Sequence, residues 1–394
     1  MPPTLASRAL RLAAAGLPTL LAASLDAQNR AAPETGAYVV RLGRDTVAVE
    51  EFTRTPGRLR GRQLVRSPRT QIREYVAELA PDGTVRRFDI AFLTPGEARP
   101  GMQAAVEYAS DSVRVRVARG DSVHTLRLAA RPGWLPLLSY SVALYEIPVS
   151  RAVRSGADSL EVTLVPIGSA SLVRSVVRRA GRGEVTVTNI AGVNRVRVDD
   201  RGRLQAWDGR GTTLKITTRR IPRVSLDALA ARFAALDREG RSFGQVSPRD
   251  SVRARVADAT VAVNYGRPFR RGRAIFGSVV PWGQVWRTGA NQATHFRTDR
   301  DLIIGSTLVP AGTYTLWTLP SPTGWQLIVN RQTGQWGTAY DASHDLARIP
   351  MQAERVLETV EQFTITVEPR DGGGVLALAW ENTRAHVPFT VKPR

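Results

Sequence analysis

The sequence predicts a mainly β protein, with an N-terminal antiparallel sheet or half-barrel that carries one helix, followed by a jelly-roll-like C-terminal β-sandwich. The chain has 394 residues, which is more than a single hydrophobic core usually accommodates. Apolar and polar residues alternate along many short segments, as they do in half-buried strands. We therefore predict two β-rich domains over residues 37–240 and 251–394, joined by a polar, turn-rich linker at 241–250.

The first 27 residues have the features of a secretory signal peptide. Arg8 and Arg11 precede a short apolar run at 12–23, and Ala27 ends a tail of small residues. Leu25 fits the small-residue rule poorly, so cleavage after Ser24 is an alternative. We expect export to the periplasm or the cell exterior, and a plain amphipathic helix is the competing interpretation. No later stretch is apolar enough to predict a transmembrane segment.

The chain is strongly basic and contains no cysteine. Its formal net charge is +20, and Lys215 and Lys392 are its only lysines. Arginines recur at every second position, for example at Arg114 and Arg116, which places them on the solvent face of strands. We therefore expect no nucleic-acid partner, although weak attraction to an anionic envelope surface remains open. Without cysteine, disulfides, thiol chemistry and a lipid-modified cysteine anchor are excluded.

Residues 37–220 show a succession of strand patterns. Apolar positions at 75, 77 and 79 lead into the turn Pro81-Asp82-Gly83, and alternation resumes at 88, 90 and 92. The same pattern recurs at 113–117, 123–128, 160–164, 185–187 and 196–198. One apolar and one polar face per strand indicate an antiparallel sheet curled over a core or a ligand.

One clear helical pattern covers residues 225–236. Leu226 and Phe233 fall on the same apolar stripe, Ser225 is suited to cap the first turn, and Gly240 follows the last one. We expect this helix to pack on the preceding sheet.

Strand patterns return after residue 252 and support a sandwich or barrel. They cover 261–265, 301–304, 314–319, 325–329, 363–367, 375–380 and 387–391. Gly- and Pro-containing breaks at 310–312, 321–324 and 371–374 separate them.

Most catalytic signatures are absent from the sequence. There is no P-loop, no dinucleotide fingerprint, no Gly-x-Ser-x-Gly elbow and no Ser-x-x-Lys motif. The four histidines occur singly, with no pair spaced to hold zinc on one helix face. We expect neither a cofactor nor a metal.

The most distinctive polar cluster lies in the segment 265–294. Trp286, Arg287, Thr288 and Asn291 combine an indole, a guanidinium, a hydroxyl and an amide beside glycines. Such groups are suited to recognise a carboxylate, a phosphate or sugar hydroxyls. Alternatively, Arg287 and Asn291 satisfy backbone groups of a long buried loop.

A second polar cluster follows at 330–348. Its candidate binding residues are Trp336, Tyr340 and Asp341, and if this loop folds toward 287–295 the two clusters form one pocket. A His295–Asp345 or His344–Asp341 pair is a candidate general base. The two aspartates are equally suited to pair with Arg287 or Arg348 in a structural network.

The region from about 250 to 391 resembles the bacterial family catalogued as domain of unknown function 2911. The resemblance rests on Tyr265-Gly266-Arg267-Pro268, Gly272-Arg273, Ile275-Phe276-Gly277, Val280-Pro281-Trp282-Gly283, residues 285–291, Pro310-Ala311-Gly312-Thr313-Tyr314, Trp325, Asn330, Gln335-Trp336-Gly337, Tyr340-Asp341, Asp345 and Trp380-Glu381. It implies an exported, β-rich domain and no established reaction, so no catalytic residue is carried over.

Three functions follow from these patterns. The first is a non-catalytic envelope protein whose C-terminal sandwich binds a small polar or glycan ligand. The second is a hydrolase that uses His295 or His344 with a nearby aspartate. The third is a carrier in which the N-terminal half-barrel encloses a lipid or another apolar molecule.

Overall fold

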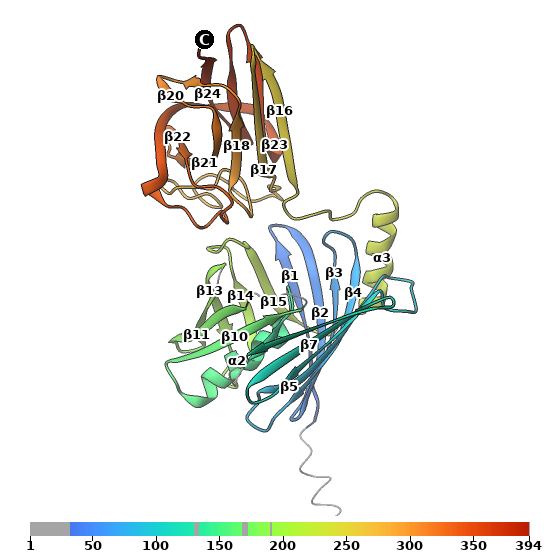
Figure 1. Cartoon of the computed structure of the whole chain (residues 1–394). Coiled ribbons are helices and arrows are strands. Elements are labelled where there is room, and N and C mark those ends of the chain that lie inside the picture. Colours follow the sequence, from blue (N-terminus) through green and yellow to red (C-terminus); the bar gives the residue numbers. More distant parts are fainter. Residues whose placement is uncertain (1–31, 130–133, 168–171, 190, 394) are drawn as a thin grey trace, which may run out of the picture.

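The computed structural model describes residues 32–129, 134–167, 172–189 and 191–393 (Figure 1). The predicted signal peptide, residues 1–27, lies outside these ranges. The described residues form one sheet of fifteen strands and one of nine. This confirms the predicted mainly β class, with a large N-terminal antiparallel sheet followed by a C-terminal sheet.

The N-terminal sheet has the strand order β8-β7-β6-β5-β4-β3-β2-β1-β15-β14-β13-β12-β11-β10-β9. Neighbours pair antiparallel, except β9 and β10, which are parallel. Its strands are β1 (Glu34–Leu42), β2 (Asp45–Thr55), β3 (Arg58–Val65), β4 (Gln71–Leu79), β5 (Val85–Leu93), β6 (Met102–Tyr108), β7 (Ser112–Arg119), β8 (Ser122–Ala129), β9 (Leu135–Leu137), β10 (Ser159–Pro166), β11 (Val173–Gly181), β12 (Glu184–Asn189), β13 (Gly192–Val198), β14 (Leu204–Asp208) and β15 (Ile216–Ile221). The seam where β1 pairs with β15 joins the first and second halves of the sheet, with Ala37 opposite Ile221.

Helix α2 (Val142–Ser155) lies inside the curl of this sheet (Figure 1). Its Leu144 and Ile147 belong to the same buried cluster as Tyr38 of β1 and Val177 of β11. The concave side of the half-barrel is therefore largely filled by the chain itself.

The sequence did not predict α2, and the reason is the proline inside it. Apolar side chains and Glu146, Pro148 and Ser150 are all buried along it. Proline lacks the backbone N–H that a helix interior uses, so Pro148 inside the apolar run at 142–149 argues against a helix there.

Helix α3 (Leu226–Arg238) confirms the helix predicted at 225–236, and the Ser225 side chain accepts the Ala228 N–H at 3.4 Å. It lies on the other face of the sheet, where Leu226 and Ala230 pack with Val49 and Leu64. The sheet covers only one face of this helix, which matches its amphipathic sequence.

The C-terminal sheet has the order β16-β17-β18-β21-β22-β23-β24-β19-β20. Its elements are β16 (Arg249–Val256), β17 (Ala259–Gly266), β18 (Thr294–Thr298), β19 (Leu302–Ile304), β20 (Thr307–Val309), β21 (Gly312–Pro320), β22 (Trp325–Asn330), the short 3-10 helix η1 (Ala342–His344), β23 (Asp345–Arg370) and β24 (Gly373–Val391). Strands from both ends of the order, such as β17 and β19, contribute Val261 and Ile304 to one apolar core. The sheet therefore curls into a sandwich-like shell.

Arg271 joins the two β-rich parts of the chain. Its guanidinium pairs with Asp45 at 3.0 Å, donates to the Phe243 carbonyl at 3.1 Å and lies 3.8 Å from the centre of the Phe243 ring. The Arg44 N–H also donates to the Arg271 carbonyl at 3.3 Å. Arg271 is thus a buried cation that contacts both the turn between β1 and β2 and the segment before β16.

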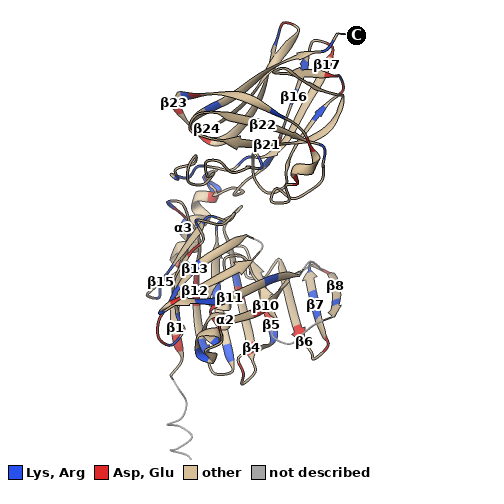
Figure 2. Ribbon diagram, turned by 90° about the vertical axis from the view of Figure 1, so that its left-hand side faces the viewer, with Lys and Arg blue, Asp and Glu red and all other residues tan. Residues whose placement is uncertain are grey.

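Basic and acidic positions are spread over many strands of both sheets rather than collected on one element (Figure 2). Within the described ranges, neither helix has the length and apolarity that a bilayer crossing requires.

Candidate functional site

The structure brings the two polar clusters singled out in the sequence into contact at one end of the C-terminal sheet. The Gly337 N–H donates to the Asn291 carbonyl at 2.9 Å, and the Ala293 N–H donates to the Gln335 carbonyl at 3.2 Å. The loop before β18 and the loop after β22 are therefore tied together through their backbones.

Trp286 anchors the first loop on the sheet. Its ring stacks on Trp380 at 6.0 Å between ring centres and meets the edge of Phe363 at 5.0 Å. Its backbone exchanges two hydrogen bonds with Thr318, at 2.8 and 2.9 Å. The indole thus belongs to the aromatic core, which holds the next residue, Arg287, in a fixed position.

Thr288 forms hydrogen bonds with neighbouring threonines through its hydroxyl and its carbonyl. Its buried hydroxyl lies 3.2 Å from the Thr318 hydroxyl, and its carbonyl accepts the Thr294 hydroxyl at 2.7 Å. Thr288 and Asn291 both have left-handed backbone conformations, with φ of 50° and 64°. These two positions let the chain turn tightly around the Arg287 side chain.

Arg287 is mostly buried and has no anionic partner among the described residues. Its side chain lies directly beneath Gly337, where an added Cβ would come within 2.2 Å of the Arg287 Cδ. Its Nε is buried without a hydrogen-bond partner, and the guanidinium forms no ion pair within the described ranges. Burial lowers the pKa of this group, which shows that its environment disfavours the charge.

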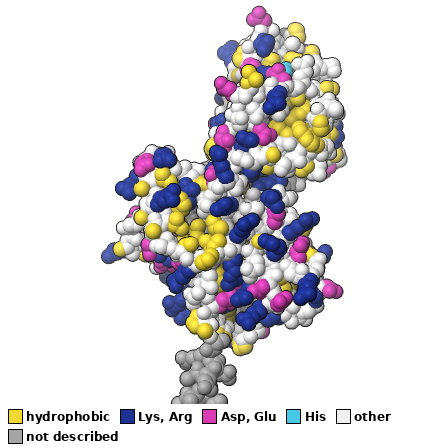
Figure 3. Space-filling view, turned by 180° about the vertical axis from the view of Figure 1, so that it is seen from behind, with side chains coloured by type: hydrophobic (Ala, Val, Ile, Leu, Met, Phe, Trp, Pro, Cys, Tyr) yellow, Lys and Arg dark blue, Asp and Glu magenta, His cyan; other side chains and the backbone are white. Residues whose placement is uncertain are grey.

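Two further cations act on the same region. Burial lowers the pKa of Lys215, and the nearby guanidinium groups of Arg273 and Arg287 lower it further. Lys215 comes from the turn between β14 and β15 of the other sheet. Lys and Arg side chains gather around the junction of the two sheets in the view from behind (Figure 3).

Trp336 and Asn291 remain accessible beside Arg287. The Trp336 side chain is 50% exposed, and Asn291 is exposed with a long 3.5 Å hydrogen bond to the Ser247 carbonyl. An exposed indole and an exposed amide are therefore held by the same loop contacts as Arg287.

Tyr340 and Asp345 form a structural network at the edge of this region. Asp345 accepts from Tyr340 at 2.6 Å, from the buried Asn330 at 2.9 Å and from Arg348 at 3.1 Å. Burial, followed by the bond to Asp345, raises the pKa of Tyr340 to about 12. Both oxygens of Asp345 are thus engaged, and its cationic partner is Arg348 rather than Arg287.

His295 is not paired with a carboxylate. Its Nε2 accepts the Gly334 N–H at 3.0 Å, and its Nδ1 lies 3.3 Å from Arg249 Nη2. Burial and the Arg249 charge lower its pKa, so the ring is neutral at pH 7. The proposed His295–Asp345 dyad is therefore not formed.

His344 does contact Asp341, with 3.1 Å between Nδ1 and Oδ2. Their side chains are 49% and 50% exposed, and Asp341 also accepts the Ser343 N–H and hydroxyl. This pair lies on the surface of the short helix η1. In the described part of the chain, no group of three or more acidic or histidine side chains is arranged to hold a metal ion.

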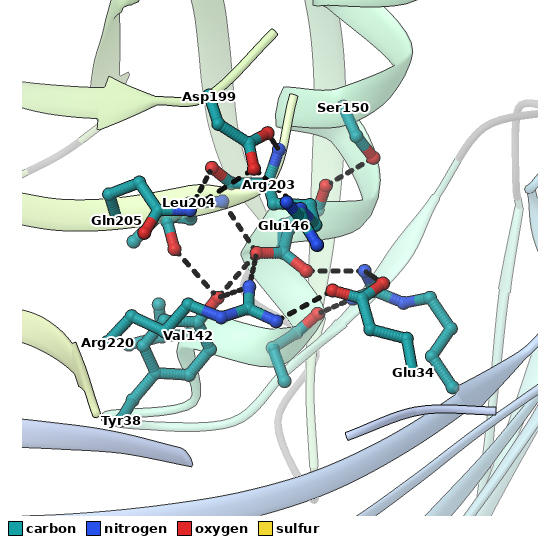
Figure 4. Close-up of polar contacts among 12 residues, drawn as sticks. Glu34, Tyr38, Val142, Glu146, Ser150, Asp199, Arg203, Leu204, Gln205 and Arg220 are labelled. Atoms are coloured by element: carbon teal, nitrogen blue, oxygen red, sulfur yellow. Dashed lines mark hydrogen bonds and ion pairs between the residues drawn. The ribbon is translucent and has the colours of Figure 1, made fainter. Parts of the chain in front are cut away.

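The N-terminal sheet holds a buried charge network that the sequence analysis missed. Glu146 of α2 is fully buried and accepts from Tyr38, Arg54, Arg220 and the Leu204 N–H (Figure 4). The signal was present as a lone carboxylate inside the apolar run at 142–149. Its partners come from distant segments, so the sequence pattern did not reveal the network.

Two large cavities adjoin the N-terminal sheet. One of about 1030 Å³ lies between the last turns of α2 and the hairpin turns at the end of the sheet. Another of about 760 Å³ lies on the outer face beside the start of α3. The cavity of about 1030 Å³ lies between α2 and the sheet, which is where the carrier hypothesis requires a ligand to bind.

Comparison with known proteins identifies only the C-terminal part. Residues 247–389 match the family model described as protein of unknown function, DUF2911, which confirms the resemblance noted in the sequence. No family model matches the N-terminal half, and no curated protein matches the chain.

Two crystal structures resemble the chain distantly. A DUF1089 family protein from Pseudomonas aeruginosa is 15% identical, with 41% of this chain and 89% of that chain covered and a TM-score of 0.31. A β-barrel-like DUF1849 domain protein from Brucella abortus is 12% identical, with 49% and 97% covered and a TM-score of 0.34.

Proposed function

We propose that this is an exported envelope protein whose C-terminal β-sandwich binds a small anionic polar molecule, such as an acidic sugar or a sugar phosphate, without catalysing a reaction. The observation that carries this proposal is the buried guanidinium of Arg287, which lacks an anionic partner in the described residues.

A buried cation without a partner is costly, because the protein interior solvates charge poorly. Buried polar groups in folded proteins almost always have partners, and a bound ion or ligand is one way to supply a partner to an unpaired group. A carboxylate or phosphate would supply the missing acceptor, and the planar guanidinium matches either group with two parallel hydrogen bonds. Lys215 and Arg273 add positive potential from the same side.

The neighbouring groups define the rest of the ligand. The half-exposed Trp336 offers a flat apolar surface, and Asn291 offers an amide that donates and accepts hydrogen bonds. Apolar walls with a few directed polar groups are typical of small-molecule sites. A sugar ring with one anionic substituent matches this combination.

The histidines favour binding over hydrolysis. The Nε2 of His295 already accepts the Gly334 N–H, and no carboxylate among the described residues contacts the ring to orient it as a general base. The His344–Asp341 pair is half exposed on the surface, where water screens its charges.

Export is supported by the leader-like segment at 1–27. When the full chain is expressed in a Gram-negative bacterium, we expect it in the periplasm or the medium. Mass spectrometry of its N-terminus should find a chain that begins at Leu25 or Gln28. An uncleaved chain confined to the cytoplasm would contradict export.

Arg287→Met is expected to weaken binding of glucuronate or inorganic phosphate by about tenfold or more, as measured by isothermal titration calorimetry. Methionine keeps an unbranched apolar stem beneath Gly337 and removes the charge. In the absence of ligand we expect the melting temperature to stay the same or to rise, because an unpaired buried charge has been removed.

Arg297→Met is the matched control, since Arg297 is an exposed arginine of β18. It should leave binding and stability nearly unchanged. Equal affinity of the wild type for glucose and glucuronate, or no binding of either anion, would contradict the proposal. A fall in the melting temperature of Arg287→Met without ligand would instead assign Arg287 a structural role.

A further inference from the structure

We propose that the cavity between the C-terminal half of α2 and the hairpin turns at one end of the N-terminal sheet binds an anionic amphiphile, a molecule with one acidic group and a hydrocarbon chain. Its volume is about 1030 Å³, just above the roughly 300–1,000 Å³ typical of ligand pockets. This site is independent of the one at Arg287.

The cavity is built from segments far apart in sequence. The turns after β2 and β4 contribute Pro56, Pro81 and Gly83, and the turn between β13 and β14 contributes Arg201. Gly202 of that last turn packs so closely on α2 that an added Cβ would lie 2.8 Å from the Ser150 Cα. This contact fixes the turn against the helix and gives the cavity a rigid wall.

Apolar side chains line the interior of the cavity. Ile147 on α2, Leu79 at the end of β4 and Leu160 on β10 face it from three elements. Leu79 and Leu160 are only partly buried, although they pack against the main core. A hydrocarbon chain would cover this surface and remove it from water.

The arginines that line the cavity differ in whether they are already neutralised. Arg54 pairs with Glu34 and Glu146, and Arg203 pairs with Asp199. These two therefore hold the cavity wall together and are not available to a ligand.

Two further lining arginines, Arg154 and Arg201, have no ion-pair partner within the described ranges, whereas a third, Arg151, interacts with the charge of Asp82. The Arg151 Cδ lies 3.6 Å from where a Cβ of Gly83 would be, so its stem crosses the turn beside Asp82. Arg154 and Arg201 are exposed at the rim. Among the described residues, the lining carboxylates are Glu34, which is paired, and Asp82, which interacts with Arg151, so Arg154 and Arg201 leave the rim with a positive excess.

The combination of surfaces defines the ligand class. A purely polar anion would leave the leucine and isoleucine surface in water, and a neutral hydrocarbon would leave the arginines without a partner. An acidic group at the rim with its chain directed inward satisfies both surfaces.

The test is calorimetric titration of the full chain with dodecanoate and with dodecyl phosphate, each below its micelle concentration. We expect both amphiphiles to bind, and the stronger of the two identifies the preferred acidic group. Acetate, which lacks the chain, and dodecyltrimethylammonium, which has the opposite charge, should bind at least about tenfold more weakly.

The double variant Arg154→Gln with Arg201→Gln should bind dodecanoate about three- to tenfold more weakly, because two exposed charges contribute modestly each. The double variant Arg178→Gln with Arg197→Gln removes the same charge from exposed positions outside the cavity lining and should bind like the wild type. Leu160→Trp, which fills the cavity without changing the charge, should also weaken binding.

The proposal fails if the wild type binds neither dodecanoate nor dodecyl phosphate. It also fails if the cationic amphiphile binds equally well, or if both double variants lose affinity alike. Arg287→Met should leave dodecanoate binding unchanged, which separates this site from the one in the C-terminal sandwich.

Discussion

Glu146→Ala is expected to lower the free energy of unfolding by about 3–5 kcal/mol, the range typical when one partner of a buried ion pair is removed. Glu146 is fully buried and lies 3.0 Å from Arg220, and it also pairs with Arg54. These two arginine side chains are only 15% and 17% exposed. The Leu204 N–H, 2.6 Å from the carboxylate, would lose its acceptor.

Glu146 also serves as acceptor for the hydroxyl of Tyr38, whose pKa is raised mainly by burial, so this hydroxyl stays protonated and donates. Removal of the carboxylate therefore leaves donors with nothing to accept from them, at the point where α2 meets both halves of the sheet (Figure 4).

Equilibrium denaturation of the full chain measures this effect. Glu146→Gln should fall between wild type and alanine, since it keeps one acceptor and loses the charge. Glu78→Ala removes an exposed carboxylate of the same sheet and should change stability by less than about 0.5 kcal/mol. A loss below about 1 kcal/mol for Glu146→Ala would show that the network does not hold α2 in place.

Glu50→Ala is expected to lower the free energy of unfolding by about 2–5 kcal/mol, because buried donors left unsatisfied cost about 1–3 kcal/mol each. Glu50 accepts the Val142 and Ala143 N–H groups at 2.7 and 2.9 Å, at the start of α2. Its other oxygen accepts from the hydroxyls of Tyr75 and Ser141 at 2.7 and 2.6 Å. The carboxylate thus caps a helix N-terminus that is closed to water.

Glu50→Gln separates the charge from the hydrogen bonds. The amide oxygen accepts from the two backbone N–H groups, and the amide nitrogen donates to the hydroxyls of Tyr75 and Ser141. We therefore expect a much smaller loss than for alanine.

The difference in stability between wild type and Glu50→Gln should depend on pH, and the raised pKa of Glu50 determines the direction of the change. Burial raises the pKa of Glu50 above its ordinary value of 4.5, so the folded state keeps a proton that the unfolded state has lost. The resulting stabilisation is fully present below about pH 4.5 and is lost as the pH rises through the folded-state pKa. The stability of wild type relative to Glu50→Gln should therefore fall as the pH is raised above about 4.5, and a rise would contradict the assignment.

The strands and α3 were predictable because each has one covered and one open face, which leaves a period of two or of 3.6 in the sequence. Helix α2 was not predictable in this way, because Pro148 inside its apolar run argues against a helix. The concave surface was predicted as space for a core or a ligand, and α2 fills most of it.

The candidate site was predictable in part. The polar segments around Arg287 and Trp336 were visible as clusters, and the structure places them side by side. The sequence did not show that Arg287 lacks an anionic partner among the described residues. Asp341 and Asp345 in the neighbouring loop were candidate partners, but in the structure they bond to other groups. Lys215 comes from a turn of the other sheet, a contact that no local pattern encodes.

The seam between β1 and β15 has a consequence for how the chain assembles. Ala37 of β1 pairs with Ile221 of β15, although most of the N-terminal half of the chain lies between them in sequence. Strands β2 to β8 and β10 to β15, in contrast, pair with their neighbours in sequence. Closing so long a loop is entropically expensive, so we expect the two meanders to form early and the seam to form late. Because α2 lies between the two meanders, we expect it to dock while the sheet is still open, before β1 pairs with β15 and encloses it.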